Sequence, residues 1–154
     1  MSRKFDETDV RILNELQENG RQSIVELASR IHLTKTPCSE RVKRLERDGV
    51  IKGYCAIVDP DRVEKNHVTV VHINLAKTAS GVLDEFSKAV VDIPEVETCL
   101  MIAGSFDFML KIRTRDINEF RSLLGDTICN LPGVQQTHSF AVMETVKDRQ
   151  HIPL

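Results

Sequence analysis

The first fifty residues place apolar side chains three or four positions apart, the spacing of a helix with one buried face. In "DETDVRILNELQENG" these residues follow an acidic start and precede Gly20, so we predict a helix in this segment. The segment "SIVELASRIHL" opens with Ser23 followed three positions later by Glu26, a spacing typical of a capping box. It predicts a second, shorter helix.

A third helix is predicted within "TKTPCSERVKRLERDG", after a tight turn at residues 32–33. Thr34 or Thr36 can cap its N-terminus, where the first turn has unpaired backbone amides. Pro37 is tolerated in that first turn because no intrahelical donor is needed there, and Gly49 can end the helix.

The predicted third helix has two different faces. Cys38, Val42 and Leu45 form an apolar stripe that we expect to be buried. The opposite face is polar and basic, and comprises Thr36, Ser39, Glu40, Lys43, Arg44 and Arg47. A short helix, a tight turn and a helix with such an outward face are typical of a helix-turn-helix, whose second helix enters the major groove of DNA. A merely solvated helix face is the alternative.

Charge is distributed unevenly along the chain. Residues 1–53 contain 11 Lys or Arg against 9 Asp or Glu, whereas residues 54–154 contain 10 against 14, in a chain of net charge -2. Five of the basic residues lie between Lys35 and Arg47. Lys and Arg neutralise DNA phosphates, while polar neighbours can read base edges. The charge distribution therefore favours DNA binding by the third helix.

The remaining two thirds of the chain contain an internal repeat. After a predicted strand at "VIKGYCAIV" and a turn-rich connection at "DPDRVEKNH", two segments match at an offset of 38 residues. Each has an alternating apolar segment, a helical pattern and an apolar-Pro-X-Val step into another strand. The order β-α-β-β-α-β predicts an α+β fold with a ferredoxin-like antiparallel sheet and both helices on one face.

The sheet face away from these helices is predicted to be apolar. The residues expected to point toward the helices are Val71, Ile73, Leu75, Phe108, Leu110 and Ile112. The residues expected on the other face are Cys99, Met101, Met109, Ala141 and Met143. So much apolar surface predicts oligomerisation through this face, and a partly covered sheet in a monomer is the alternative.

Composition and dispersed reactive residues argue against several other classes of protein. The chain of 154 residues is 41% hydrophobic and 29% charged, as in globular proteins of one or two small domains. Its longest apolar runs are too short to span a membrane, and "MSRKFDETD" lacks the apolar core of a signal peptide, so we expect a cytoplasmic location. The four cysteines and five histidines lack metal-ligand spacing, and we expect no metal, no cofactor and no enzyme activity.

An RNA-binding module would share the predicted topology of the repeat. Such modules stack bases on aromatic side chains of the open sheet face. The chain has six Phe, one Tyr and no Trp, and Met and Cys are predicted on that face. Assembly through the sheet therefore fits the sequence better.

The quoted motifs resemble those of one known family, the Lrp/AsnC (feast/famine) transcription regulators. The resemblance lies in "FDETDVRILNELQENGR", "TPCSERVKRLERDGVIKGY", "AGSFDFMLK" and "LPGVQQTHSFAVMETVK", and it covers essentially the whole chain. It implies a helix-turn-helix (winged-helix-like) domain at residues 1–53, a linker strand and turn at 54–66, and a ferredoxin-like effector-binding and oligomerisation domain at 67–154. Members of the family form dimers that assemble to octamers or similar forms and bind amino acids between dimers.

Two sets of site residues are predicted. The resemblance places Thr36, Pro37, Ser39, Arg41, Lys43, Arg44 and Arg47 on the family's recognition helix, and the predicted DNA-binding set comprises Lys35, Thr36, Pro37, Ser39, Glu40, Lys43, Arg44 and Arg47. The resemblance places Gly104 and Asp107 in the family's effector turn, and the predicted topology adds Met101, Ala103, Ser105, Thr137 and Ser139 to the effector-binding set. Many relatives have an acidic residue in place of Ser105, so the neutral side chain favours leucine or methionine as the amino acid. A plain hairpin turn at Gly104 and Asp107 is the alternative for the residues themselves.

We therefore expect a sequence-specific DNA-binding regulator of amino-acid metabolism whose assembly and DNA binding respond to a small amino acid. Its expected partners are double-stranded DNA, the amino-acid effector and further copies of the chain. A DNA-architectural protein of the same fold without an effector is the alternative.

Overall fold

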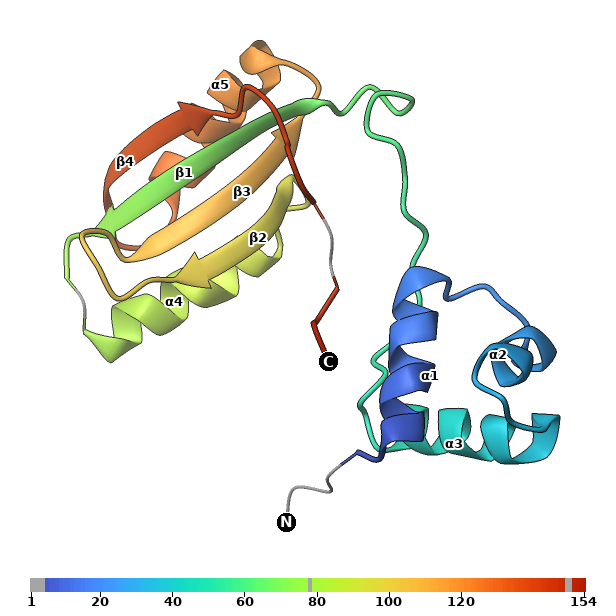
Figure 1. The fold of residues 1–154 in the computed structure, drawn as a ribbon. Coiled ribbons are helices and arrows are strands. Elements are labelled where there is room, and N and C mark those ends of the chain that lie inside the picture. Colours follow the sequence, from blue (N-terminus) through green and yellow to red (C-terminus); the bar gives the residue numbers. More distant parts are fainter. Residues whose placement is uncertain (1–4, 78, 149–150) are drawn as a thin grey trace. The chain divides into compact units, whose positions relative to one another are not determined.

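The computed structural model describes residues 5–77, 79–148 and 151–154, which divide into two compact units. The helical unit contains residues up to Ile57 together with those from Asp148 onward, and the sheet unit runs from Val58 to Lys147. In Figure 1 the helical unit is coloured blue to teal, apart from its red C-terminal residues, and the sheet unit is coloured green to red. Residues 151–154, which we expected with the sheet, pack with the helices because the Gln17 side chain and the Ile152 backbone exchange two hydrogen bonds of 3.1 and 2.7 Å.

The helical unit contains three helices, α1 (Glu7–Glu18), α2 (Ile24–Arg30) and α3 (Lys35–Arg47). The capping box of α2 is confirmed, since Ser23 accepts from the Glu26 amide and the Glu26 carboxylate accepts from the Ser23 amide. Gly49 ends α3 as predicted, with φ of 71°.

One apolar cluster joins the three helices. Its buried members are Ile12, Leu13, Leu27, Ala28, Ile31, Cys38, Val42 and Leu45. The predicted apolar stripe of α3 is confirmed, because Cys38, Val42 and Leu45 are each at most 5% exposed. Burial of this stripe fixes which side of α3 remains outside.

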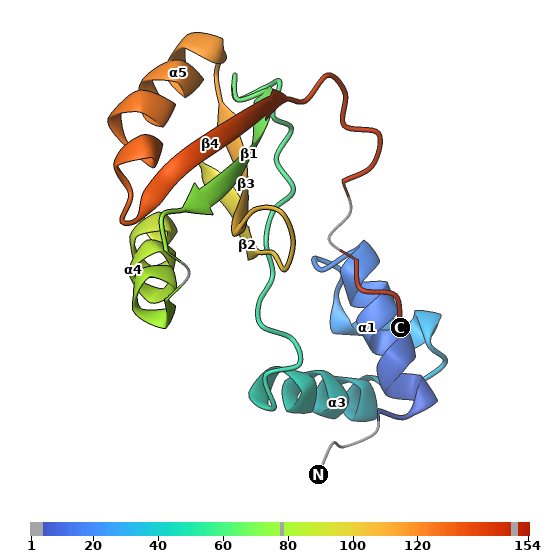
Figure 2. The same ribbon diagram turned by 90° about the vertical axis from the view of Figure 1, so that its left-hand side faces the viewer.

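The sheet unit has the predicted β-α-β-β-α-β order. Its elements are β1 (His67–Leu75), α4 (Ser80–Val91), β2 (Val96–Met101), β3 (Phe108–Thr114), α5 (Ile117–Asp126), a short 3-10 turn (Ile128–Asn130) and β4 (Val134–Ala141). The strands form one antiparallel sheet in the order β2-β3-β1-β4. Figure 2 shows both helices on one side of this sheet, which confirms the ferredoxin-like prediction.

The core of the sheet unit lies between the sheet and its two helices. It comprises Val71, Ile73, Leu75, Phe86, Val90, Ile93, Phe108, Leu110, Ile112, Phe120 and Ile128. The rings of Phe86 on α4 and Phe108 on β3 lie 4.4 Å apart at a tilt of 34°. The six residues predicted to face the helices all belong to this core.

The strand predicted at "VIKGYCAIV" is wrong, because residues 50–58 form no strand. The amides of Val50 and Ile51 instead donate to the Leu45 carbonyl, at 2.9 and 3.1 Å, and so close the end of α3. The following Tyr54 hydroxyl donates to Glu46 at 2.9 Å. A strand needs a neighbouring strand for its ladder hydrogen bonds, and no other described segment pairs with residues 50–58.

The predicted membership of the open sheet face was wrong at three positions. Cys99 packs against the helix-side core, and Met101 and Ala141 lie opposite the buried Phe108 and Thr69. For Cys99 and Met101 the error follows from the register shift in β2 between Val96 and Thr98, and for Ala141 from the shift in the β1–β4 pairing at Asn74 and Leu75, since the face of a residue depends on its register.

Met109 lies on the open face as predicted, and Met143 lies beyond the end of β4. We call the open face the side formed by Val70, His72, Leu100, Met109 and Phe140. These residues form an apolar patch around His72, with Phe140 52% and Leu100 46% exposed, and the same side of the sheet also carries the polar residues Asn74, Thr98, Lys111, Gln136 and His138. None of the helices in the described parts of the chain combines the length and hydrophobicity that a membrane span requires.

Candidate DNA-binding helix and effector turn

The turn between α2 and α3 sets the direction of α3. His32 adopts the left-handed region with φ of 59°, a conformation that glycine or asparagine takes more readily. The Leu33 amide then donates to the Ala28 carbonyl at 2.8 Å, which satisfies the end of α2. Thr34 follows as the N-cap position of α3, although its side chain makes no capping hydrogen bond.

Most of the residues predicted to bind DNA lie on the outer side of α3. Five are exposed, namely Lys35, Thr36, Glu40, Lys43 and Arg47, while Pro37 and Ser39 are half-buried. Arg47 also contacts its neighbour Asp48 at 3.2 Å, yet its side chain is 72% exposed and free to turn outward. The exposed part of α3 therefore combines three cations with short polar groups that could reach DNA bases.

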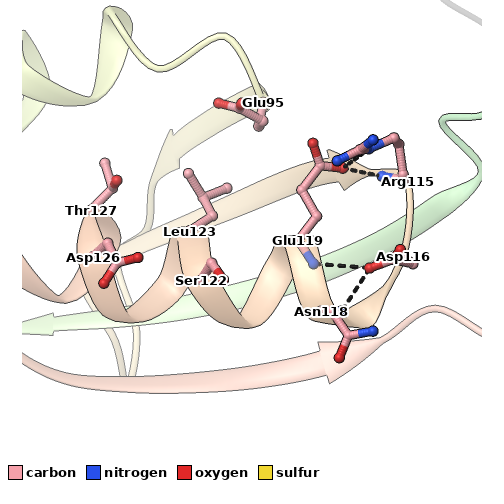
Figure 3. A pocket seen from close by; sticks show the side chains of 9 residues that line it. All are labelled: Glu95, Arg115, Asp116, Asn118, Glu119, Ser122, Leu123, Asp126 and Thr127. Carbon is pink, nitrogen blue, oxygen red and sulfur yellow. Dashed lines mark hydrogen bonds and ion pairs between the residues drawn. The ribbon is translucent and has the colours of Figure 1, made fainter.

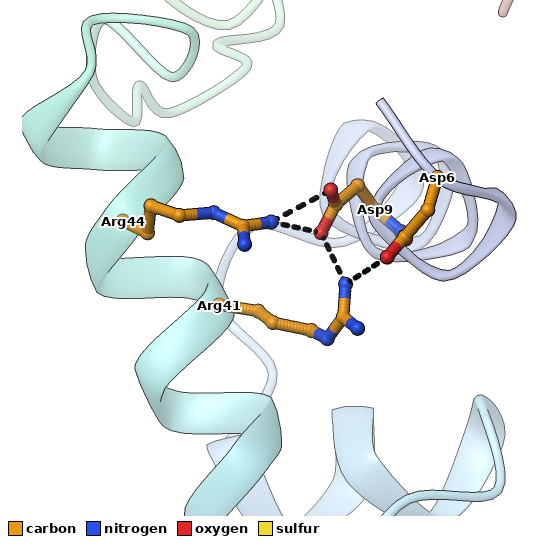
Figure 4. A network of polar contacts seen from close by, with 4 residues as sticks. All are labelled: Asp6, Asp9, Arg41 and Arg44. Atoms are coloured by element: carbon orange, nitrogen blue, oxygen red, sulfur yellow. Dashed lines mark hydrogen bonds and ion pairs between the residues drawn. The ribbon is translucent and has the colours of Figure 1, made fainter. Parts of the chain in front are cut away.

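Arg44 is placed differently from the other predicted residues. One of its terminal nitrogens, Nη2, donates to both carboxylate oxygens of Asp9 at 2.6 Å. Arg41 donates through Nη1 to Asp9 at 2.8 Å and to Asp6 at 2.6 Å. Figure 4 shows both guanidinium groups reaching from α3 to this pair of carboxylates at the start of α1.

This network is a feature that the sequence reasoning missed. The hydrogen bond from Arg41 lowers the pKa of Asp6, and the two carboxylates raise the pKa of Arg41. Asp9 is only 4% exposed. The three-residue spacing of Asp6 and Asp9 was visible in the sequence, but it was interpreted only as an acidic helix start.

The predicted effector turn joins β2 to β3 and is held by several hydrogen bonds. The Ile102 amide donates to the Asp107 carbonyl at 2.8 Å, and the Asp107 amide donates to the Ile73 carbonyl at 2.9 Å. The Asp107 carboxylate accepts from the Leu75 amide at 2.7 Å. Asp107 thus ties the turn to the end of β1, and its Oδ2 already has a partner.

Gly104 lies at the exposed tip of this turn. Its φ is not positive, and a Cβ atom added there would meet only Ile102 Cγ2, at 3.5 Å. Neither backbone conformation nor packing within the chain therefore requires glycine at this position. Ala103 and Ser105 beside it are exposed as well.

The remaining effector candidates do not gather in one place. Met101 is on β2 and Ser139 is on β4, the two outer strands of the sheet. With neighbouring strands about 4.8 Å apart, three strand spacings separate these edges by about 14 Å. A single free amino acid cannot bridge that distance, so one chain alone does not bring Met101 together with Thr137 and Ser139.

A separate hollow of about 500 Å³ lies along one side of α5, from the N-cap Asp116 to the C-cap Thr127. Figure 3 shows that Glu95, Arg115, Asp116, Glu119 and Asp126 border it. Glu119 accepts hydrogen bonds from the Arg115 amide and from Lys65, and these bonds lower its pKa to about 2. Asp116 caps α5. Within the described residues, no three His, Cys, Asp or Glu side chains gather in a geometry that could bind a metal ion.

The chain matches two domain families over nearly its whole length. Residues 5–52 match the winged helix-turn-helix DNA-binding domain, and residues 68–152 match the Lrp/AsnC ligand binding domain. The first match lies within the helical unit, and the second covers the sheet unit from residue 68 and extends into the C-terminal residues that pack with the helices.

Named relatives are similar along the full chain. A leucine-responsive regulatory protein of Haemophilus influenzae is 41% identical over 99% of this chain and 92% of its own length. The leucine-responsive regulatory protein of Escherichia coli is 43% identical over 96% of this chain and 90% of its own length. A proline dehydrogenase transcriptional activator of Rhizobium radiobacter is 44% identical over 94% and 92%.

A solved structure gives the same result for the fold. A transcriptional regulator of Neisseria meningitidis in complex with L-methionine superposes with a TM-score of 0.92, at 33% identity, covering 97% of each chain. With both domains matched and with relatives above 40% identity, this chain belongs to the Lrp/AsnC family of transcriptional regulators, with an N-terminal helix-turn-helix DNA-binding domain and a C-terminal amino-acid-binding domain.

Proposed function

We propose that α3 is the recognition helix and that Lys35, Lys43 and Arg47 supply its phosphate contacts. The observation that carries this assignment is the exposure of these three cations, Lys43 and Arg47 on the outer side of α3 and Lys35 in its first turn, while the apolar stripe faces the core. The short polar residues Thr36, Ser39 and Glu40 then bear on the choice of sequence, and Pro37 shapes the first turn. We do not assign a phosphate contact to Arg44, because its guanidinium group is bound by Asp9.

The dependence of DNA binding on salt tests this assignment. Each lost phosphate contact lowers the slope of log K against log salt by about 0.9, so Lys43→Ala and Arg47→Ala should each lower both affinity and slope. Arg121→Ala is the matched control, because Arg121 is exposed on α5, outside the helical unit. Unchanged affinity and slope in both α3 variants would contradict the assignment.

The proposed effector is an apolar amino acid, leucine or methionine, bound beside the turn at Ala103, Gly104, Ser105 and Asp107. Support comes from Gly104, since nothing within the chain requires glycine there and the space beside it stays open. Further support comes from the similar Neisseria meningitidis regulator, which forms a complex with L-methionine. The neutral Ser105 suits an apolar side chain better than a charged one.

Two chains would have to share such a site if all seven candidates contribute. Met101 and the turn would come from one subunit, and Thr137 and Ser139 from another, since they lie on opposite outer strands. Ligand binding and assembly are then linked, and each changes the other by the same free energy.

Calorimetry with leucine and methionine tests the effector site. Gly104→Val should abolish binding, because the added branched side chain occupies the open space, while DNA binding without effector persists. Gly125→Ala is the control, since Gly125 lies on α5 with nothing within 4 Å of an added Cβ. Undiminished binding in Gly104→Val, or an oligomer size indifferent to every amino acid, would favour an architectural protein without an effector.

The open face is proposed as the dimer contact, and further assembly gives an octamer or a similar form. An exposed apolar sheet face of this kind is costly in water. Phe140→Glu should shift the mass measured by light scattering toward the monomer, whereas Val91→Glu on the exposed side of α4 should not. An unchanged mass in Phe140→Glu would place the contact elsewhere.

The regulated genes are proposed to serve amino-acid metabolism. The similar activator of proline dehydrogenase from Rhizobium radiobacter supports this class of target. The named relatives are bacterial proteins, and a DNA-binding regulator of a bacterium acts in the cytoplasm, where we place this protein.

A further inference from the structure

The basic side chains of α3 divide into two groups that the sequence does not distinguish. Lys43 and Arg47 are exposed on the outer side of the helix, and Lys35 is exposed in its first turn. Arg41 and Arg44, with side chains 29% and 37% exposed, lie on the flank facing α1 and are bound by Asp6 and Asp9. The two arginines and the two carboxylates together carry no net charge.

Asp9 is the centre of this network. Its side chain is 6% exposed, and it accepts hydrogen bonds from both guanidinium groups. Asp6, whose side chain is 53% exposed, forms a second ion pair with Arg41. Asp6 also accepts a hydrogen bond of 2.8 Å from the Asp9 amide. The backbone around Asp9 is therefore fixed by a cap, and its carboxylate has a defined direction.

Electrostatics opposes the release of Arg44 to DNA. If Arg44 turned to a phosphate, Asp9 would lose the donor that reaches both of its oxygens and would keep only the contact with Arg41, and a buried carboxylate with less compensation is unfavourable. A phosphate contact on a solvated surface contributes less free energy than the contact with buried Asp9, because water and salt screen it. Keeping the arginine on Asp9 is the lower-energy arrangement.

We propose that Asp9, assisted by Asp6, is a positioning residue that withholds Arg41 and Arg44 from DNA phosphates. This inference rests on the proposed DNA-binding role of α3. Its functional consequence is a lower sequence-independent affinity: phosphate contacts strengthen binding to any sequence about equally, so each arginine that Asp9 withholds weakens non-specific binding to DNA.

Salt dependence distinguishes paired from free cations. Binding of the full-length protein is measured against salt concentration on a short duplex of random sequence, and on a duplex selected by the protein from random DNA. Arg44→Gln should leave the slope unchanged, whereas Lys43→Gln, a matched change one position away, should lower it by about 0.9. A fall of similar size in Arg44→Gln would overturn the inference.

Removing the Asp9 carboxylate should change the salt slope in the opposite direction. Asp9→Asn should raise the slope on the random duplex by about 0.9 for each arginine released, and should strengthen binding to that duplex. The double variant Asp9→Asn with Arg44→Gln should return part of that increase. A folded Asp9→Asn protein with wild-type slope and wild-type affinity for the random duplex would show that the network only stabilises the fold.

Two further comparisons separate failure of this inference from misfolding of a variant and from failure of the recognition-helix assignment. If circular dichroism shows that Asp9→Asn does not fold, Asp6→Asn and the Arg44→Gln comparison carry the test, since Asp6 is half-exposed. If Lys43→Gln and Arg47→Gln also leave the slope unchanged, the recognition-helix assignment fails instead. If they lower it and Arg44→Gln does too, only the withholding of Arg44 fails.

Discussion

The two units of the chain differ in the kind of polar group that they bury. Among the described residues, the sheet unit buries the hydroxyls of Thr69 and Thr114, whereas the helical unit buries the carboxylate of Asp9. Thr114 donates to a backbone carbonyl at 3.1 Å, and Thr69 lies 3.1 Å from the His67 ring nitrogen, so neutral neighbours suffice. Asp9 needs two arginines. The sheet unit is therefore a scaffold held by apolar packing, and the helical unit depends partly on charge.

The apolar core of the helical unit is also smaller than that of the sheet unit. The buried cluster of the sheet unit contains eleven residues and includes three phenylalanines, while that of the helical unit contains eight and has no aromatic ring. A smaller core leaves a larger share of stability to caps, turns and ion pairs. The helical unit should respond more strongly to changes at those features, and the sheet unit to loss of core volume.

Phe86→Ala should give the largest effect and should be confined to the sheet unit. Phe86 is fully buried and contacts Phe108, so truncation leaves a cavity and should cost about 3 to 5 kcal/mol. Amide hydrogen exchange read by mass spectrometry should rise in peptides from the sheet unit and stay unchanged in α1 to α3. Val91→Ala on the exposed side of α4 is the control. Equal loss of protection in both units would refute their independence.

Cys38→Ser should give an intermediate effect in the helical unit. The thiol is fully buried, and this burial raises its pKa. A buried hydroxyl without a partner should destabilise the unit by about 1 to 2 kcal/mol, measured by denaturant unfolding. In the native wild type, a thiol reagent should modify the exposed Cys55 and Cys129 rapidly and Cys38 slowly. Rapid labelling of Cys38 would contradict its place in the core.

These two predictions use positions of the kind that the sequence predicts well. The burial of Cys38 followed from helical periodicity, and the ferredoxin-like order followed from the repeat, because both patterns are local. The strand expected at 50–58 failed because pairing depends on a partner strand, which no local pattern reveals. The face of Met101 failed because one register shift in β2 reverses the alternation beyond it.

For the candidate sites too, local sequence does not reveal partners that lie far away along the chain. A helical wheel places Arg44 on the polar face of α3 opposite the buried stripe, but the carboxylate that binds it lies 35 residues earlier on another helix. The wheel gives a direction and not a partner. Likewise the sequence places Ser139 and the turn at Gly104 in the same domain, but only the strand order shows that β4 and β2 lie at opposite edges.

Acid should weaken the sheet unit through a surface carboxylate. The Arg115 amide and Lys65 hold the pKa of Glu119 at about 2, below its ordinary 4.5. A lowered folded-state pKa contributes stability that is complete above the unfolded value and is lost as the pH falls through the folded value. Glu119→Gln should therefore flatten the loss of sheet-unit stability between about pH 4.5 and pH 2. An identical acid profile in wild type and variant, followed by hydrogen exchange, would show that this carboxylate does not contribute.

His32→Gly should give the smallest effect, a gain of about 0.5 kcal/mol in the helical unit. His32 has φ of 59°, which is strained for a side chain with a Cβ atom, and glycine relieves that strain while adding freedom to the unfolded chain. The control is the other positive-φ turn next to α3, at Gly49 with φ of 71°. Nothing lies within 4 Å of a Cβ added there, so Gly49→Ala tests the backbone alone and should destabilise the unit by about 1 kcal/mol. Denaturant midpoints that move in opposite directions for the two variants would show that the turns at both ends of α3 contribute through backbone conformation. A destabilised His32→Gly protein would mean that the imidazole makes a contact worth more than the strain.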